Sequence, residues 1–148
     1  MKTHRIVNEA VSAAPPDAVW RLLADPLTWP GFSPVGKAVI ERPGTAEPTG
    51  LGMIRRLQTG PLRMREEVVA SEAPRHHAYI LLSGMNLRDY RGDVTLTPHG
   101  GGTRIHWEVS FTGAFPGAVA FWKPGLSRAL KGFAKGLARA AEQAAPAA

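Results

Sequence analysis

The sequence predicts an α+β fold in which one long C-terminal helix packs against an antiparallel sheet. The segment 116–144 spaces its large apolar residues three or four positions apart, which places them on one stripe of a helix. Most of the preceding chain consists of short runs that alternate apolar and polar residues between turn residues. A single amphipathic helix that follows a set of strands can bury its stripe only against their sheet. The stripe comprises Leu126, Leu130, Phe133, Leu137 and Ala141.

The N-terminal part of the chain predicts one strand, over residues 5–11, and two short helical segments. Pro15 and Pro16 suit the first turn of a helix, where the backbone N–H has no helical partner. This helix should end at Asp25, because a residue that precedes a proline avoids the helical conformation. A second helical turn is expected over residues 27–31.

Six further strands are expected before the C-terminal helix. Turn residues separate them, most clearly in the glycine-rich segment 98–102. The connections are short, so consecutive strands should pair in the antiparallel sense. The expected strands cover residues 37–42, 52–58, 62–71, 77–82, 88–97 and 103–111.

Alternation within these strands predicts which side chains face the helix. In the strand 62–71, the opposite register would bury Arg63, Arg65 and Glu67, at a greater cost of desolvation. The expected inward positions are Leu62, Met64, Glu66, Val68, Tyr79, Leu81, Tyr90, Gly92, Val94, Leu96, Thr103, Ile105, Trp107, Val109 and Phe111.

Length and composition are those of an ordinary globular protein. The chain has 148 residues, of which 44% are hydrophobic and 20% charged. We expect a single domain over residues 1–148, with residues 145–148 as a loose tail. The absence of cysteine excludes disulfides, thiolate metal ligands and cysteine nucleophiles.

Neither a signal peptide nor a membrane span is expected. The N-terminus lacks an uninterrupted apolar run, and no stretch reaches the ~18 apolar residues of a transmembrane helix. The expected location is the cytoplasm. The net charge is +6, but the basic residues are spread along the whole chain. This distribution favours a solvated basic surface over a nucleic-acid site.

Five local motifs follow one another along nearly the whole chain. They are Ala14-Pro15-Pro16-Asp17-Ala18-Val19-Trp20 with Asp25 and Trp29; Gly50-Leu51-Gly52; Glu66 to Pro74; Asp89-Tyr90-Arg91-Gly92; and Gly101-Gly102-Thr103-Arg104 before Trp107. In this order they resemble the START-like (SRPBCC) helix-grip superfamily, in particular its bacterial polyketide cyclase/dehydrase-like group. The resemblance implies a curved seven-stranded antiparallel sheet that grips the C-terminal helix around a ligand cavity. Its members include lipid carriers, hormone receptors and aromatic polyketide cyclases, so the fold does not by itself settle the function.

The inward positions and the helix stripe supply candidates for the wall of such a cavity, since ligand pockets are mostly apolar with a few placed polar groups. The candidates are Trp29, Phe32, Met53, Arg55, Met64, Tyr79, Leu81, Trp107, Phe111, Leu126, Leu130 and Phe133. The alternative, that most of these side chains simply pack the core, stays open.

Glu66 is the candidate catalytic residue. Burial would raise the pKa of its carboxyl group, which suits a base that removes a proton next to a carbonyl. Tyr90, or Tyr79, would serve as a hydrogen-bond donor to the substrate. Two alternatives remain: Arg55 pairs with Glu66 across the adjacent strand, or Glu66 is solvated at an end of the sheet.

No metal ion or other cofactor is expected. The five histidines are scattered, and no acidic residue lies at a spacing that completes a tetrahedral site. The glycine run 100–102 lacks the lysine of a phosphate-binding loop and leads into a strand.

The C-terminal helix carries basic residues opposite its apolar stripe. They are Arg128, Lys131, Lys135 and Arg139. We expect them to form the solvated face of a docked helix, and contact with a membrane surface is the alternative. Nucleic-acid binding is not expected, because no aromatic residues interleave with these cations.

Three functions are compatible with the sequence. The favoured one is binding or transport of a hydrophobic or amphipathic small molecule, such as a lipid, polyketide or aromatic compound. The second is a polyketide cyclase or dehydratase, without a metal, that uses an inward glutamate as acid or base. The third is an interaction protein resembling a chaperone cofactor, which would need an exposed apolar patch. The sequence identifies neither the ligand nor the oligomeric state.

Overall fold

The structure is a computed structural model that describes residues 2–144. The predicted loose tail, residues 145–148, lies outside the described residues. The elements, in chain order, are β1 (His4–Ser12), α1 (Pro16–Ala24), the 3₁₀ helix η1 (Pro26–Gly31), β2 (Lys37–Arg42), β3 (Ile54–Thr59), β4 (Leu62–Glu72), β5 (His76–Ser83), β6 (Leu87–His99), β7 (Gly102–Gly113) and α2 (Ala118–Ala144).

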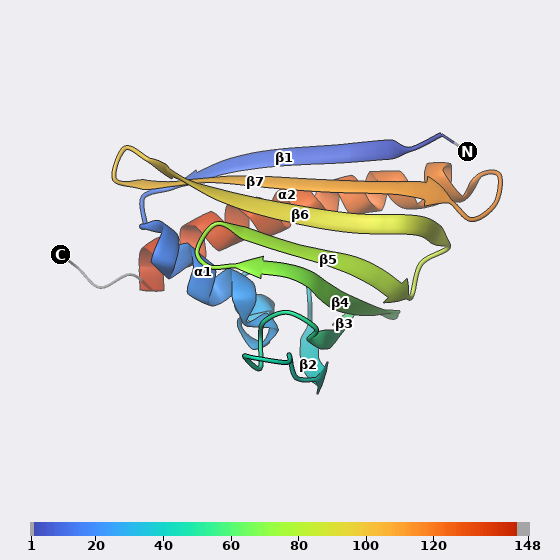
Figure 1. The fold of residues 1–148 in the computed structure, drawn as a ribbon. Coiled ribbons are helices and arrows are strands. Elements are labelled where there is room, and N and C mark those ends of the chain that lie inside the picture. Colours follow the sequence, from blue (N-terminus) through green and yellow to red (C-terminus); the bar gives the residue numbers. More distant parts are fainter. Residues whose placement is uncertain (1, 145–148) are drawn as a thin grey trace.

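The seven strands form one antiparallel sheet in the order β1-β7-β6-β5-β4-β3-β2. Consecutive strands from β2 to β7 pair with each other, and β1 completes the sheet beside β7. Figure 1 shows the resulting curvature: β2 and β3 turn away from the direction of β1 and β7. The predicted α+β helix-grip fold is confirmed.

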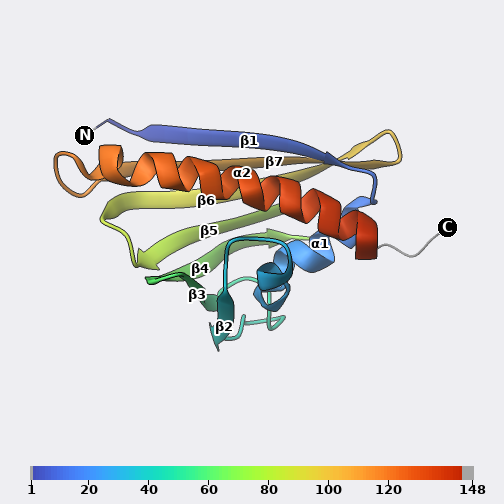
Figure 2. The same cartoon turned by 180° about the vertical axis from the view of Figure 1, so that it is seen from behind.

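Helix α2 lies along the concave face of the sheet, and α1 and η1 close one end of it (Figure 2). The apolar stripe is buried at Leu130, Phe133, Leu137 and Ala141, while Leu126 is half-buried. The predicted basic face is exposed at all four of its cations, Arg128, Lys131, Lys135 and Arg139. The helix therefore docks with the orientation that its sequence predicts.

The C-terminal half of α2 approaches its neighbours closely. The hydroxyl of Ser12, at the end of β1, donates a hydrogen bond of 2.7 Å to the carbonyl of Ala138. A Cβ atom at Gly136 would collide with the backbone carbonyl of Phe32, just after η1. Glycine at this position therefore permits the contact between α2 and the η1 corner.

The predicted faces of the strands are confirmed, and some boundaries shift. The inward residues Trp107 and Phe111 are fully buried, as is Val68 on β4. The strand expected from residue 52 begins at Ile54, because Gly52 has φ +89° and cannot continue a strand. The C-terminal helix begins at Ala118, after the turn at residues 114–117.

Candidate functional site

A cavity of about 360 Å³ lies between the concave face of the sheet and the N-terminal half of α2. Aromatic and aliphatic side chains form most of its wall, and the polar exceptions include one carboxylate. Its wall comprises Trp29, Pro34, Leu57, Thr59, Leu62, Met64, Glu66, Tyr79, Met85, Tyr90, Trp107, Phe121, Trp122, Gly125, Leu126, Ala129, Leu130 and Phe133.

The helical wall is built by residues of α2 between Phe121 and Phe133. Trp122, four residues before Leu126, continues the apolar stripe toward the N-terminus of the helix. Phe121 also lines the wall but is 73% exposed. Its ring packs edge-to-face against that of Trp122, with the ring centroids 5.0 Å apart. The indole Nε1 of Trp122 is buried and has no hydrogen-bond acceptor among residues 2–144.

An aromatic cluster on the sheet faces this helical wall. The indole Nε1 of Trp107 donates a hydrogen bond of 3.0 Å to the hydroxyl of Tyr79. Tyr79 lies across Gly92 of the neighbouring strand, where a Cβ atom would collide with the tyrosine ring. Tyr90 packs beside Tyr79 with ring centroids 6.4 Å apart. Gly92 thus provides the space that the Tyr79 ring occupies beside the cavity.

Glu66 belongs to a buried network with Arg55 and His77. Arg55 and Glu66 occupy directly opposite positions on β3 and β4. The Arg55 Nε donates to Glu66 Oε1 at 3.0 Å, and Nη2 lies 2.9 Å from the same oxygen without forming a well-directed hydrogen bond. The Arg55 Nη1 lies 3.0 Å from His77 Nε2. An arginine can only donate, so His77 accepts at Nε2 and carries its proton on Nδ1.

Two aromatic rings complete the surroundings of the Arg55 guanidinium. Its Cζ lies 4.3 Å from the ring centroid of Trp29 and 4.7 Å from that of Tyr79. Such cation–π contacts stabilise a desolvated cation. Trp29 is itself fixed by a hydrogen bond from its Nε1 to the carbonyl of Leu23, at 3.2 Å. Trp29, in η1, therefore helps to hold the Arg55 guanidinium in place beside Glu66.

Burial sets the protonation behaviour of this site. Desolvation raises the pKa of Glu66, and the Arg55 charge and hydrogen bond partly oppose that rise. Desolvation, with the Arg55 charge, holds the pKa of His77 well below its usual value. Burial, followed by the charge of Glu66, raises the pKa of Tyr79, so this hydroxyl stays protonated at neutral pH. The site thus combines one ionic pair with neutral hydrogen-bonding groups.

Most of the predicted site residues meet at this cavity. Those on its wall are Trp29, Met64, Glu66, Tyr79, Tyr90, Trp107, Leu126, Leu130 and Phe133. Of the alternatives for Glu66, the structure has the pair with Arg55, and the carboxylate is 4% exposed rather than solvated at a sheet end.

The other predicted site residues lie elsewhere. Arg55 sits behind Glu66 and is fully buried. Met53 is buried in the turn before β3, and Phe111 is a core residue stacked on Tyr90. Leu81 is half-buried opposite Glu66, and Phe32 lines a separate hollow beside Gly132 and Gly136.

Sequence reasoning missed several wall residues, of which Leu57 and Trp122 had a detectable signal. Leu57 follows Arg55 by two positions on the same strand, so the two side chains share a strand face. Trp122 lies four residues before Leu126 on the same helical stripe. Pro34 and Met85 come from connections between elements, for which the hydrophobic periodicity gives no direction.

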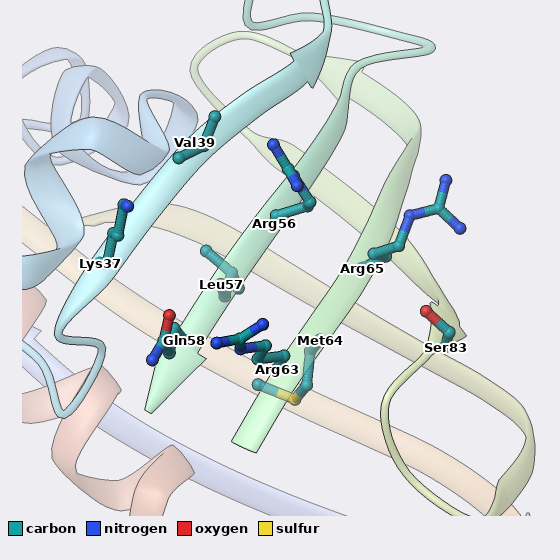
Figure 3. A pocket seen from close by; sticks show the side chains of 9 residues that line it. All are labelled: Lys37, Val39, Arg56, Leu57, Gln58, Arg63, Met64, Arg65 and Ser83. Atoms are coloured by element: carbon teal, nitrogen blue, oxygen red, sulfur yellow. The ribbon is translucent and has the colours of Figure 1, made fainter. Parts of the chain in front are cut away.

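A second hollow, of about 380 Å³, lies over β2, β3 and β4 (Figure 3). Its wall combines the cationic side chains of Lys37, Arg56, Arg63 and Arg65 with the apolar side chains of Val39, Leu57 and Met64. Arg56 and Arg65 lie directly opposite each other, and Glu41 pairs with Arg65 at 2.6 Å. Because side chains alternate along β3, Arg56 lies on the sheet face opposite to that of Arg55. This hollow therefore differs from the first cavity in its four cations, and the two hollows share Leu57 and Met64 in their walls.

Two further properties concern metals and membranes. Residues 2–144 contain no cluster of three or more histidine, aspartate or glutamate side chains suited to a metal ion. Within the same residues, neither α1 nor α2 is long and apolar enough to cross a bilayer.

The curved sheet, the long helix and the cavity between them define a START-like helix-grip protein. The chain belongs to the family described as polyketide cyclase/dehydrase and lipid transport, whose model matches residues 3–142. No curated protein sequence matches the chain.

Solved structures share this fold at low sequence identity. The ZhuI aromatase/cyclase from Streptomyces sp. R1128 has a TM-score of 0.81 at 19% identity, over 96% of this chain and 95% of its own. A START superfamily protein from Mycobacterium smegmatis has a TM-score of 0.80 at 16% identity, over 96% and 99% of the two chains. Norcoclaurine synthase from Thalictrum flavum, in complex with dopamine and hydroxybenzaldehyde, has a TM-score of 0.76 at 17% identity, over 99% and 90%.

Proposed function

We propose that this protein binds or carries a hydrophobic or amphipathic small molecule, such as a lipid, polyketide or aromatic compound. The observation that carries the proposal is the cavity of about 360 Å³, whose wall is mainly aromatic and aliphatic. This volume falls within the usual range of small-molecule pockets. The family description, which includes lipid transport, supports the proposal. So does the fold neighbour that holds dopamine and hydroxybenzaldehyde.

Filling the cavity tests this proposal. Leu130 is 3% exposed and lies on the cavity wall, so Leu130→Trp should occupy the space that a ligand needs. We expect the affinity for the neutral fluorescent probe N-phenyl-1-naphthylamine to fall by about tenfold or more, the equivalent of one well-placed apolar contact. Fluorescence titration measures the affinity, and native mass spectrometry of the purified protein shows whether a co-purified small molecule is lost.

Leu51→Trp is the matched control, because Leu51 is 52% exposed outside the cavity. This variant should bind the probe as the wild type does. Unchanged affinity in Leu130→Trp would contradict the proposal, since the probe would then bind at some other place.

A second candidate function is proton-transfer catalysis of the cyclase or dehydratase type. The observation that favours it is Glu66, a carboxylate on the cavity wall whose pKa is raised by burial. A raised pKa makes a carboxylate a stronger base toward a proton next to a carbonyl. The buried hydroxyls of Tyr79 and Tyr90 supply donors for the carbonyl oxygen on the same wall.

Deuterium exchange tests this second function. The methyl protons of 2-acetylnaphthalene lie next to a carbonyl, and NMR in D2O follows their exchange. The wild type should accelerate this exchange, and Glu66→Gln should lose about a hundredfold of the acceleration or more. Glu67→Gln, on the opposite face of β4, is the control. Equal acceleration by Glu66→Gln and the wild type would remove Glu66 from the mechanism.

A further inference from the structure

Two residues of the cavity wall, Trp122 and Glu66, each carry a polar atom that has no hydrogen-bond partner among residues 2–144. One is the indole Nε1 of Trp122 on α2, which is buried and meets no acceptor among residues 2–144. An indole N–H can only donate a hydrogen bond. Buried polar groups are almost always paired, so this unpaired donor on a residue of the cavity wall favours a ligand acceptor as its partner. Because the nitrogen itself is buried, the indole or its neighbours must shift for the acceptor to reach it.

The second atom is Oε2 of Glu66 on β4. Every hydrogen bond and ion pair of this carboxylate within the described residues goes through Oε1, to Arg55. Oε2 therefore has accepting capacity to spare, and Glu66 lies on the cavity wall. Since Glu66 belongs to the sheet and Trp122 to α2, the donor and the acceptor come from the two facing walls of the cavity.

The charge of the site favours a neutral ligand group beside Glu66. The Arg55 guanidinium already balances the carboxylate from within 3.0 Å. A ligand ammonium in the cavity would leave an excess positive charge in a desolvated site, which is costly. A phenol or alcohol hydroxyl donates a hydrogen bond to Oε2 without adding a positive charge.

We propose that Trp122 and Glu66 select a neutral ligand that carries a hydrogen-bond acceptor at one end and a hydroxyl at the other. The acceptor, a ketone or similar carbonyl, accepts from the Trp122 Nε1. The hydroxyl donates to Glu66 Oε2. An aromatic or otherwise apolar body joins them along the wall formed by Leu126, Leu130 and Tyr79. This inference rests on the proposed binding function and specifies the chemistry of its ligand.

Three naphthalene probes of nearly equal size separate the two contacts. The probe 6-acetyl-2-naphthol carries both groups, 6-ethyl-2-naphthol lacks the acceptor, and 2-acetylnaphthalene lacks the hydroxyl. We expect the complete probe to bind about tenfold more tightly than either partial probe, as one buried hydrogen bond allows. Calorimetric titration measures the three affinities.

Trp122→Phe removes the N–H but keeps an aromatic ring. In this variant the acetyl and ethyl naphthols should bind equally. Trp20→Phe, on α1 and outside the cavity wall, is the matched control and should keep the preference. A ketone preference that persists in Trp122→Phe would overturn the role of Trp122.

Two spectroscopic signatures test the same contacts in the unmodified protein. The indole N–H resonance assigned to Trp122, from its loss in Trp122→Phe, should move downfield with the ketone probes and not with 6-ethyl-2-naphthol. The bound naphthol should also keep the absorbance of its neutral form at a pH where the free probe is ionised. Absorbance of the naphtholate in the complex would overturn the role of Glu66.

The outcomes separate this inference from the proposed function. Equal affinity for all three probes, lost in Leu130→Trp, would overturn the inference and leave the binding function standing. Binding of none of the three probes would overturn both.

Discussion

At the scale of single residues, the buried pair of Arg55 and Glu66 is better explained by positioning than by stability. Burying two charges costs desolvation that their mutual attraction repays only in part, so an apolar replacement of such a pair is often as stable. Here the pair presents a carboxylate at the cavity wall, and the rings of Trp29 and Tyr79 cover the guanidinium. The geometry fixes Glu66 on the wall in one orientation.

His77 makes the stability of this network depend on pH. Its pKa is lowered well below 6.5 in the folded protein, so the unfolded chain binds a proton that the folded protein does not. The contribution of His77 to stability is therefore complete above pH 6.5 and is lost as the pH falls below it. Glu66 has the opposite sign, because its pKa is raised from 4.5 and its contribution weakens as the pH rises above that value.

Replacing His77 by glutamine isolates the first effect. The glutamine carbonyl can accept from the Arg55 Nη1 and does not ionise. We expect the wild type to lose free energy of unfolding faster than His77→Gln below pH 6.5, by at most about 1.4 kcal/mol per pH unit. Urea denaturation at a series of pH values measures the two slopes. Parallel curves for the wild type and His77→Gln would show that His77 does not titrate on unfolding.

At the scale of elements, replacement by alanine should have opposite effects on stability at two glycines of α2. Both occupy helical positions, where alanine is favoured over glycine by about 1 kcal/mol. A Cβ at Gly132 would meet Pro34 at 3.9 Å, an ordinary contact. A Cβ at Gly136 would collide with the backbone of Phe32. We therefore expect Gly132→Ala to stabilise the protein by up to about 1 kcal/mol, and Gly136→Ala to destabilise it by about 2 kcal/mol.

The urea midpoints of the two variants check this prediction directly. A Gly136→Ala protein as stable as the wild type would mean that α2 does not need its close approach to the η1 corner. A Gly132→Ala protein that loses stability would mean that alanine's helical advantage is not realised in this turn.

The elements also show what periodicity can and cannot predict. Charges on one face of β4 made the inward position of Glu66 predictable, and the spacing of the α2 stripe predicted its buried side. Which inward residues line a cavity depends on where α2 leaves the sheet. Its C-terminal half is held close through the bond between Ser12 and Ala138, whereas its N-terminal half stands over the cavity. This placement arises from tertiary contacts, so the sequence could not show that Phe111 packs in the core rather than on the cavity wall.

At the scale of the whole molecule, the apolar and charged surfaces are kept apart. The cavity faces the interior between sheet and helix, while the cationic hollow of β2–β4 and the basic face of α2 are exposed. The net charge of +6 is therefore carried on outer surfaces, and the cavity has a balanced pair. This separation allows a neutral, apolar ligand in a strongly basic protein.

The basic face of α2 leads to a prediction about membranes. Each cation close to an anionic bilayer contributes about 1 kcal/mol, so Arg128, Lys131, Lys135 and Arg139 together supply about 4 kcal/mol. With an attraction of that size, half of the protein is bound to vesicles only at about 1 mM lipid. At about 0.1 mM accessible lipid, roughly a tenth of the protein should therefore sediment with phosphatidylserine-containing vesicles at physiological salt. Full sedimentation would contradict a purely solvated role for this face, and Phe121→Ser would then test whether the exposed Phe121 supplies the missing attraction.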